Sequence, residues 1–278
     1  MKLCSFRAAG RDRYGIVVDH GIVDATRHIS ASSLRQAFSD FRALEAMTNR
    51  EADFALEAVE FLPVIPDAGK IFSVLLNYES LRLEQGRPKL QYPHLLTRLS
   101  DTQIGHGGAL QKPRASAEFD YEGELAVVIG RSGRDISAAE ATDYIAGYTC
   151  CNDATPRDWM RHSRHFTLAK SFPKTGAFGP WLVTRDAMPD LGDCRLTTLL
   201  NGQVMQNAVL GDFTYPISEL ISYISRATPL SEGDIICTGT PAGCGYKRSP
   251  PCFLKAGDTV SVSITGIGTL TNSVVDEN

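Results

Sequence analysis

The chain lacks several features that would direct it to a membrane, a nucleic acid or an oxidising compartment. None of its apolar runs is long enough to span a bilayer, and residues 1–7 lack the apolar segment of a signal peptide. Its seven cysteines include no C-x-x-C pair, which argues against a zinc site and a disulfide framework. Acidic and basic residues are interspersed, and the net charge of -4 comes without a basic stripe. We therefore expect a cytoplasmic protein with neither a membrane nor a nucleic acid as partner.

The sequence also lacks the common signatures of nucleotide binding and of serine catalysis. Residues 238–245 are rich in glycine, but they have neither the P-loop ending nor the Rossmann spacing of glycines. No G-x-S-x-G nucleophile elbow occurs anywhere in the chain. The glycine-rich stretch is better interpreted as a loop at the rim of a site.

The first 67 residues are predicted to form a small N-terminal α/β domain. Short alternating runs at residues 5–8, 14–18 and 22–25 indicate strands, because turn-forming residues separate them. From residue 32 to 59 apolar residues recur at three- and four-residue spacing, which predicts helix.

Residues 68–278 are predicted to form a second domain that is rich in short strands. The continuous apolar run at 125–129 indicates a buried strand, and 145–152 indicates another. Residues 217–228 have helical spacing. The expected class is therefore α+β and β-rich, with a catalytic domain that follows a small N-terminal one.

Three carboxylates are candidates for a metal site. Alternation along the strand that ends at residue 129 places Glu122 and Glu124 on one face, where two like charges would repel unless a cation lay between them. Asp153 follows the next predicted strand. Oxygen donors without cysteine or histidine suit Mg²⁺ or Mn²⁺, and Ca²⁺ as well. From spacing alone, the plainer interpretation is favoured: a solvated strand face, with Asp153 at the start of a turn.

The order of motifs along the chain changes that balance. The series is Asn77-Tyr78 with Glu84, Asp120-Tyr121-Glu122-Gly123-Glu124, Gly147-Tyr148-Thr149 with Asn152-Asp153 and Arg157-Asp158, Lys170-Ser171-Phe172, Gly179-Pro180-Trp181, Asn201-Gly202-Gln203, Gly233-Asp234-Ile235-Ile236 and Thr238-Gly239-Thr240-Pro241. Over about residues 68–275 this series closely resembles the fumarylacetoacetate hydrolase family, in particular its acylpyruvase and fumarylpyruvate hydrolase-like branch.

The resemblance implies a role for each matching residue. It implies a mixed β-roll or β-sandwich-like barrel, assembled as a homodimer, with the metal at the mouth of the core and a small keto acid as substrate. Glu122, Glu124 and Asp153 match metal ligands, and Lys170 matches a lysine that stabilises developing negative charge. The remaining matches are substrate-binding side chains and an acidic partner of a water-activating histidine: Arg157, Thr240, Tyr78 and Glu84.

Two positions depart from the family pattern. Leu81 stands where the family has the histidine that pairs with the glutamate at position 84, so the usual general base is missing. Met160 stands where the family usually has a glutamine. Glu84 itself could act as the base if burial raised its pKa. Four histidines are other candidates, each more simply interpreted as a surface or loop residue: His94, His106, His162 and His165.

The leading hypothesis is a metal-dependent hydrolase that cleaves a carbon–carbon bond in a 2,4-dioxo acid, with Glu84 and Lys170 as catalytic residues. An alternative is a metal-dependent decarboxylase or tautomerase of a β-keto acid such as oxaloacetate, which Leu81 favours because neither reaction needs an activated water. A hypothesis of another class is a catalytically silent relative that binds a keto acid.

Overall fold

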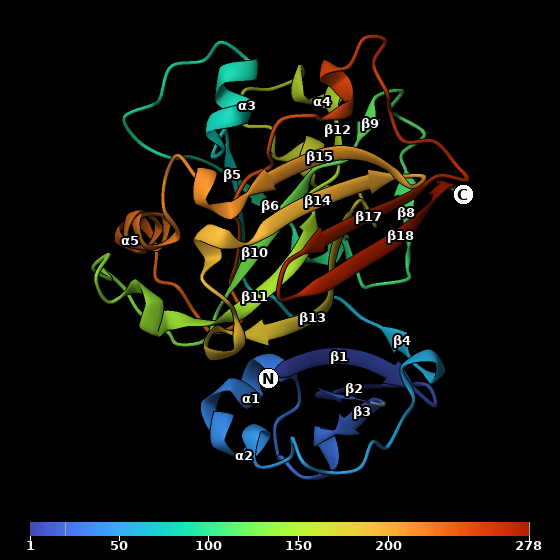
Figure 1. Ribbon diagram of the computed structural model, residues 1–278, viewed down its shortest axis with the longest axis vertical. Helices are drawn as coiled ribbons and strands as arrows, with labels where there is room; N and C mark the ends of the chain where they lie inside the picture. The colour runs from blue at the N-terminus through green and yellow to red at the C-terminus, as the bar shows by residue number, and fades with distance from the viewer. Residues whose placement is uncertain (20, 278) are drawn as a thin grey trace.

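The computed structural model describes residues 1–19 and 21–277 of the chain. Most of its regular structure is β, in agreement with the predicted β-rich α+β class, which is confirmed (Figure 1). The helices are short except for the last: α1 (Leu34–Ala37), α2 (Phe41–Glu45), α3 (Glu79–Glu84), α4 (Arg157–Met160) and α5 (Ile217–Ala227). In the part of the chain so described, no helix is both long and apolar enough to cross a membrane.

One large sheet runs through the molecule. Its members are β1 (Lys2–Ala8), β2 (Arg11–Val18), β3 (Gly21–Asp24), β4 (Glu60–Phe61), β5 (Ile71–Leu75), β6 (His94–Arg98), β7 (Gln103–Ile104), β10 (Gly123–Ile129), β11 (Ile145–Asn152), β13 (Gly176–Thr184) and β16 (Ile235–Cys237). The main path has the order β3-β2-β1-β13-β11-β10-β16-β5-β6, with β4 paired to β1 and β7 paired to β13.

A second sheet and a short ribbon complete the β structure. The second sheet has the order β15 (Gln203–Val209), β14 (Arg195–Leu200), β17 (Thr259–Ile264), β18 (Gly268–Asp276) and β8 (Ala109–Lys112). The ribbon joins β9 (Phe119–Asp120) to β12 (Thr155–Pro156) in antiparallel pairing.

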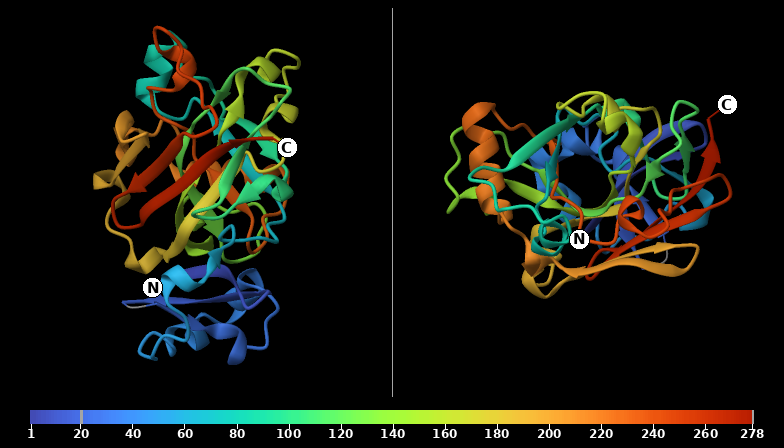
Figure 2. Two further views of the ribbon diagram at one scale, coloured as in Figure 1. Left: turned by 90° about the vertical axis from the view of Figure 1, so that its right-hand side faces the viewer. Right: turned by 90° about the horizontal axis from the view of Figure 1, so that it is seen from above.

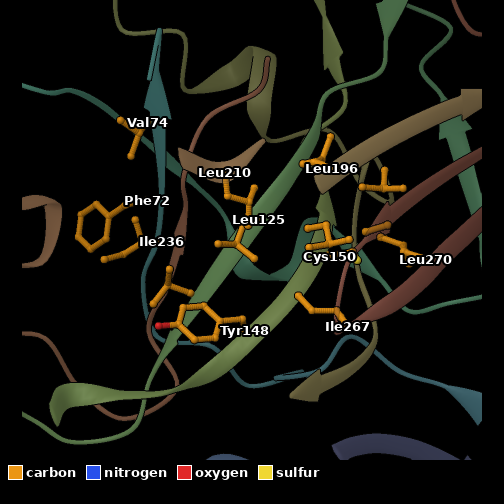
Figure 3. Packing of buried hydrophobic residues seen from close by; sticks show 14 of the residues in the cluster. Phe72, Val74, Leu125, Tyr148, Cys150, Leu196, Leu210, Ile236, Ile267 and Leu270 are labelled. Atoms are coloured by element: carbon orange, nitrogen blue, oxygen red, sulfur yellow. The ribbon is translucent and has the colours of Figure 1, made fainter. Parts of the chain in front are cut away.

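Strand β10 is buried on both faces, which explains its uninterrupted apolar sequence. Leu125, Val127 and Ile129 pack into the larger core, which the second sheet and α5 also line (Figure 3). Ala126 and Val128, on the other face, pack into a second core. Glu124 precedes Ala126 by two residues and therefore shares its face, at the end of the strand.

The N-terminal residues form a lobe below the rest of the molecule (Figure 2, left). Strand β1 continues the large sheet, because Lys2 and Leu3 pair with Val183 and Leu182 of β13. The second core also contains side chains from both parts, for example Leu34 and Phe178. The boundary near residue 67 therefore crosses a shared sheet and core, and it stays a prediction.

The helix predicted over residues 32–59 is wrong in extent. The segment forms α1, a single-turn helix at Phe38–Asp40 and α2. It then forms an isolated bridge between Phe54 and Ile22 and a second single-turn helix at Leu56–Ala58. Asp40 breaks the pattern, because its carboxylate accepts the Ala43 amide proton and starts α2 as a new helix. The apolar spacing reported the buried face correctly, but capping set the lengths.

Candidate metal centre and substrate cavity

Residues of α3 and α4 help to line a cavity of about 800 Å³. These two helices lie at the end of the molecule away from the N-terminal lobe (Figures 1 and 2). The inner part of the cavity, called here the floor, consists of charged side chains: Glu122, Glu124, Asp153, Arg157 and Lys170. Most of its other lining residues, called here the outer wall, are apolar: Val74, Leu75, Leu76, Leu81, Pro88, Leu90, Met160, Phe166, Pro251 and Phe253. Polar residues line it as well: Ser73, Gln85, Arg87, His94, Glu118, Arg161, Thr240 and Tyr246.

The ends of two paired strands bring three carboxylates together. Glu124 lies opposite Cys151 in the β10–β11 pairing. Glu122 comes just before β10 and Asp153 just after β11, so both lie at the same end of the strand pair. The Asp153 amide donates to the Glu122 carbonyl at 2.9 Å, which fixes the two backbones side by side. Carboxylate oxygens of Glu122, Glu124 and Asp153 lie within 4.8 Å of one another, and all three residues are buried.

Cations hold two of these carboxylates. Lys170 Nζ lies 2.5 Å from Glu122 Oε2 and 2.5 Å from Asp153 Oδ2. Arg98 Nη1 lies 2.5 Å from the other oxygen of Asp153, and Arg157 Nη1 lies 2.7 Å from Glu122 Oε1. Among the described residues, Glu124 has no cationic side chain at ion-pair distance, although the Gly239 amide donates to its Oε2 at 2.9 Å.

The Gly239 contact requires a glycine. Its φ of +99° lies in the left-handed region, and a Cβ there would approach the Val74 carbonyl oxygen to 2.8 Å. The motif Thr238-Gly239-Thr240 thus serves to bring a backbone donor against Glu124.

Protonation differs sharply among the floor residues. Burial, reinforced by the charge of Asp153, raises the pKa of Glu124 well above its usual range. Burial alone would also raise the pKa of Asp153, but Lys170 and Arg98 outweigh it and lower that pKa. Burial opposes the charge on Lys170, yet Asp153 and Glu122 hold its pKa above the ordinary lysine value. Without a further cation, Glu124 is therefore the carboxylate that keeps its proton.

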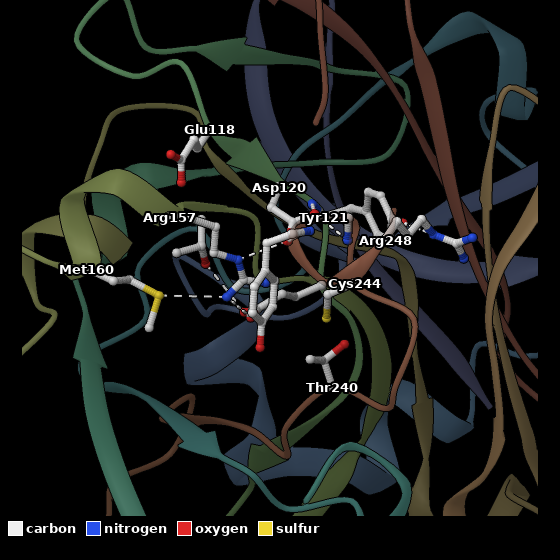
Figure 4. Close-up of polar contacts among 12 residues, drawn as sticks. Glu118, Asp120, Tyr121, Arg157, Met160, Thr240, Cys244 and Arg248 are labelled. Carbon is white, nitrogen blue, oxygen red and sulfur yellow. Dashed lines mark hydrogen bonds and ion pairs between the residues drawn. The ribbon is translucent and has the colours of Figure 1, made fainter. Parts of the chain in front are cut away.

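Arg157 is held in place from several sides (Figure 4). Its Nε donates to Asp120 Oδ2 at 2.9 Å, and its guanidinium lies over the Tyr246 ring at 4.3 Å. Nη1 also donates weakly to Met160 Sδ at 3.6 Å. Nη2 is buried without a partner, so a donor remains free at a residue that lines the cavity.

The donor set fits a hard divalent cation. When all of its members are ionised, the cluster contains four carboxylates, with Asp120 included, and three cationic side chains, which leaves one negative charge that the proton on Glu124 neutralises. A cation beside Glu124 would replace its proton and relieve the repulsion with Asp153 and Glu122. Glu122, Glu124 and Asp153 could supply the oxygen ligands that Mg²⁺ and Mn²⁺ prefer.

Other predicted site residues are placed less directly. Thr240 lines the cavity, but its hydroxyl already donates to the Gly123 carbonyl at 2.9 Å and accepts from Gln206 at 2.8 Å. Tyr78 is fully buried and does not line the cavity, and its hydroxyl has no partner. Burial raises the pKa of Tyr78, with a contribution from the charge of Glu124.

The structure does not bring the predicted base into the cavity. Glu84 is exposed at the end of α3 and is not among the lining residues. Leu81, one turn earlier, does line the cavity and is only 4% exposed. Of the four candidate histidines, His94 lines the cavity from an exposed position at its rim. The other three lie elsewhere: His106, His162 and His165.

Sequence reasoning missed two residues that organise the floor. Arg98, at the end of β6, contacts Asp153 and also donates to Thr175 at 2.7 Å and to the Ala154 carbonyl at 3.2 Å. Asp120 accepts from Arg157 and from the amides of Gly245 and Tyr246. Asp120 stood within a recognised motif, which was a signal for it, whereas Arg98 belongs to no motif.

Comparison with known proteins agrees with this architecture. Residues 70–275 match the family described as fumarylacetoacetate (FAA) hydrolase C-terminal. Oxaloacetate tautomerase YisK of Bacillus subtilis (strain 168) is 36% identical over 225 residues, which cover 80% of this chain and 75% of that protein.

Solved structures match over the whole length. A fumarylacetoacetate hydrolase from psychrophilic Exiguobacterium antarcticum superposes with a TM-score of 0.85 at 30% identity, covering 100% of both chains. Maleylpyruvate hydrolase from Sphingobium sp. SYK-6, in complex with manganese(II) and pyruvate, superposes with a TM-score of 0.84 at 26% identity, again covering 100% of both chains.

These relatives include a tautomerase as well as hydrolases, so they do not point specifically to the acylpyruvase branch expected from the motifs. The family itself is shown by the match over residues 70–275 and by the buried carboxylates that lie within it. The chain belongs to the fumarylacetoacetate hydrolase family.

Proposed function

We propose that the protein is a divalent-metal-dependent keto–enol tautomerase of a small 2-keto acid, with oxaloacetate as the reference substrate. The observation that carries the proposal is a cavity in which three buried carboxylates and Lys170 lie together while Leu81 lines the wall, at the position where the family resemblance implies a water-activating histidine. Tautomerisation moves one proton between C3 and the keto oxygen and needs no nucleophilic water. Hydrolysis needs such a water and a base to activate it.

The floor residues suit the charge changes of enolisation. A bound divalent cation would polarise the keto group and stabilise the enolate. Lys170, 1% exposed, keeps its proton because its pKa is raised, so it acts as a fixed donor to the developing oxyanion rather than as a base. Arg157 has a free donor, Nη2, for a carboxylate oxygen of the substrate.

The relatives support this proposal from a second direction. YisK of Bacillus subtilis is named an oxaloacetate tautomerase, and it is among the similar proteins at 36% identity. Hydrolysis of an acylpyruvate remains the second candidate, because the Sphingobium maleylpyruvate hydrolase shares the fold over its whole length. Decarboxylation of oxaloacetate would use the same floor.

One set of assays separates these reactions. Consumption of freshly dissolved enol oxaloacetate is followed by ultraviolet absorbance with Mg²⁺ or Mn²⁺, against metal alone and against protein with EDTA. Proton NMR of the same samples detects pyruvate from decarboxylation, and pyruvate with acetate when acetylpyruvate is supplied instead.

We expect tautomerisation of oxaloacetate to be faster with the metal-loaded protein than with metal alone, without formation of pyruvate. The tautomerisation rate should fall by about 10²–10³-fold in Lys170→Met. Cleavage of acetylpyruvate without tautomerisation of oxaloacetate would replace the proposal with the hydrolase. Thermal stabilisation by keto acids without any turnover would indicate a silent relative.

We also infer a homodimer, as the family resemblance implies. Edge strand β15 exposes two large apolar side chains, Val204 and Val209, which an interface could cover. Light scattering coupled to size-exclusion chromatography tests the inference, and a monomer at micromolar concentration would contradict it.

A further inference from the structure

The outer wall of the cavity has few polar groups that remain free to bind a substrate. Glu118 and Arg161, at its edge, pair with each other through two contacts of 2.8 and 2.9 Å. Gln85 donates its amide to the Tyr246 hydroxyl at 2.5 Å. Arg87 and His94 also line the cavity, but both are exposed at its mouth. Ser73 Oγ, which is buried without a partner, is a free polar atom of the lining, and the rest of the wall between mouth and floor offers mainly hydrocarbon.

Both departures from the family pattern lie on this wall. Leu81 lies on α3 and Met160 on α4, and both line the cavity at positions where the family resemblance implies side chains that could form hydrogen bonds. The Met160 sulfur also occupies one donor of Arg157 at 3.6 Å. Apolar side chains on two separate helices therefore line the same cavity, so the departure concerns the polarity of the wall as well as the missing base.

The charge of the floor also favours a substrate with few polar groups. With Glu124 ionised, one uncompensated negative charge remains in the cluster, so a divalent cation would leave a net charge of about +1. A 2-keto acid with a single carboxylate neutralises that charge. A second carboxylate would restore a negative charge, and apart from the free Nη2 of Arg157 and Arg87 at the mouth it would lie against the apolar wall.

The cavity is also large for a four-carbon acid. Its volume of about 800 Å³ falls in the range of roughly 300–1,000 Å³ typical of pockets that enclose much larger ligands. The space beyond the floor can hold an apolar group of the size of a phenyl ring.

We infer that this site prefers 2-keto acids with one carboxylate and an apolar arm at C3, and that Leu81 and Met160 determine this preference. The inference rests on the proposed tautomerase function. In the reaction, the C3–H bond breaks and its proton passes to water, its electron pair forms the C2=C3 double bond, and the keto oxygen takes a proton from water, so that the keto and enol forms interconvert with no net reactant.

The test compares phenylpyruvate with oxaloacetate, using exchange of the C3 protons for deuterium followed by proton NMR. With the Mg²⁺-loaded protein, we expect kcat/KM for phenylpyruvate to exceed that for oxaloacetate by about tenfold or more, because the ring is buried against the wall. In the double variant Leu81→His with Met160→Gln, the ratio should fall by about tenfold, while Mn²⁺ affinity stays unchanged.

Matched controls come from the same two segments. The control variants are Leu83→His, on α3, and Leu168→Gln, in the segment after α4. These leucines are 64% and 66% exposed, respectively, and neither lines the cavity. Neither change should alter the ratio. A wild-type protein that prefers oxaloacetate would overturn the inference, and so would an equal change of ratio in the controls.

The two proposals fail in different ways. If neither acid exchanges faster than with metal alone, the tautomerase proposal fails. The preference is then read from calorimetric titration of each acid into the Mn²⁺-loaded protein. Tighter binding of phenylpyruvate would support the inference, and equal or tighter binding of oxaloacetate would overturn it.

Discussion

The floor and the outer wall of one cavity are built in different ways. Much of the floor lies at the ends of β10 and β11, strands that are buried on both faces. Ion pairs of 2.5 to 2.9 Å link its side chains. The wall comes from the end of β5, from coil, from α3 with 6 residues and from α4 with 4, and α4 also supplies Arg157 to the floor.

This difference separates chemistry from selectivity. A floor held by sheet pairing and buried charge tolerates little change, since each charge depends on its partners. The wall contributes contacts that depend on apolar area, and its residues can change without breaking the cluster. Leu81 and Met160 are changes of that kind. The predictions below test whether the two regions are in fact separable.

The largest expected effect lies in the floor. Replacing Glu122, Glu124 or Asp153 by Ala should weaken Mn²⁺ binding by at least about 100-fold, because a small hard cation depends on anionic oxygens for charge and geometry. Calorimetric titration of Mn²⁺ into each variant measures the loss. Leu81→Ala, on the wall, is the matched control and should bind Mn²⁺ as the wild type does. Wild-type affinity in one carboxylate variant would remove that residue from the set of ligands.

Arg98 should matter next most, through stability. Among residues 1–19 and 21–277, Arg98→Met leaves Asp153 with Lys170 as its one ion-pair partner, in a site where both partners of the lost pair are at most 1% exposed. Breaking such a pair costs roughly 3 kcal/mol of unfolding free energy. Urea denaturation of the metal-free protein measures the change. Arg185→Met breaks an exposed pair with Asp143 and should cost much less. Equal losses in the two variants would show that Arg98 does not support the floor.

The pH dependence of stability should reveal the proton on Glu124. Because the pKa of Glu124 is raised in the folded protein, its stabilising contribution is present at low pH and is lost as pH rises through that pKa. The pKa of Asp153 is lowered, so its contribution is present above the unfolded value and is lost as the solution becomes strongly acidic. The increase in melting temperature on adding Mn²⁺ should therefore grow as pH rises through the Glu124 pKa.

Glu124→Gln provides the control for this pH effect. It cannot titrate at that position, so the loss of stability of the metal-free protein at higher pH should disappear. Proton release on Mn²⁺ binding, measured by calorimetry in buffers of different ionisation enthalpy, should also fall. A metal-free wild type with the same pH profile as the variant would contradict the assignment.

The floor could be predicted from the sequence, and the wall could not. Strand alternation places Glu122 and Glu124 on one face, and antiparallel pairing brings Asp153 to the same end. Spacing alone favoured a solvated strand face, however, and the order of motifs along the chain was needed to single out these three carboxylates as a site. Arg98 was missed because its contact with Asp153 spans 55 residues and depends on where β6 lies in the sheet.

The sequence also did not reveal which side chains of α3 are exposed and which line the cavity. Glu84 and Leu81 share a helical pattern, yet one is exposed and the other lines the cavity. Only the packing of α3 against the rest of the molecule decides which side faces inward. The helix expected over 32–59 failed for a related reason, since periodicity reports a buried face and not where capping ends a helix.

The smallest effect is expected from a substitution that restores the missing base on the wall. Leu81→His places an imidazole in the cavity, and Glu84 follows three residues later on α3, close enough to orient it. We expect acetylpyruvate hydrolysis to rise by about tenfold, less than a fully aligned general base contributes, with Mn²⁺ affinity unchanged. Pyruvate release measures the rate, with Leu81→Gln as a polar control that cannot accept the proton. Glu84→Gln in the histidine variant should remove the gain. An equal rise with glutamine would mean that polarity on the wall, and not a base, limits hydrolysis.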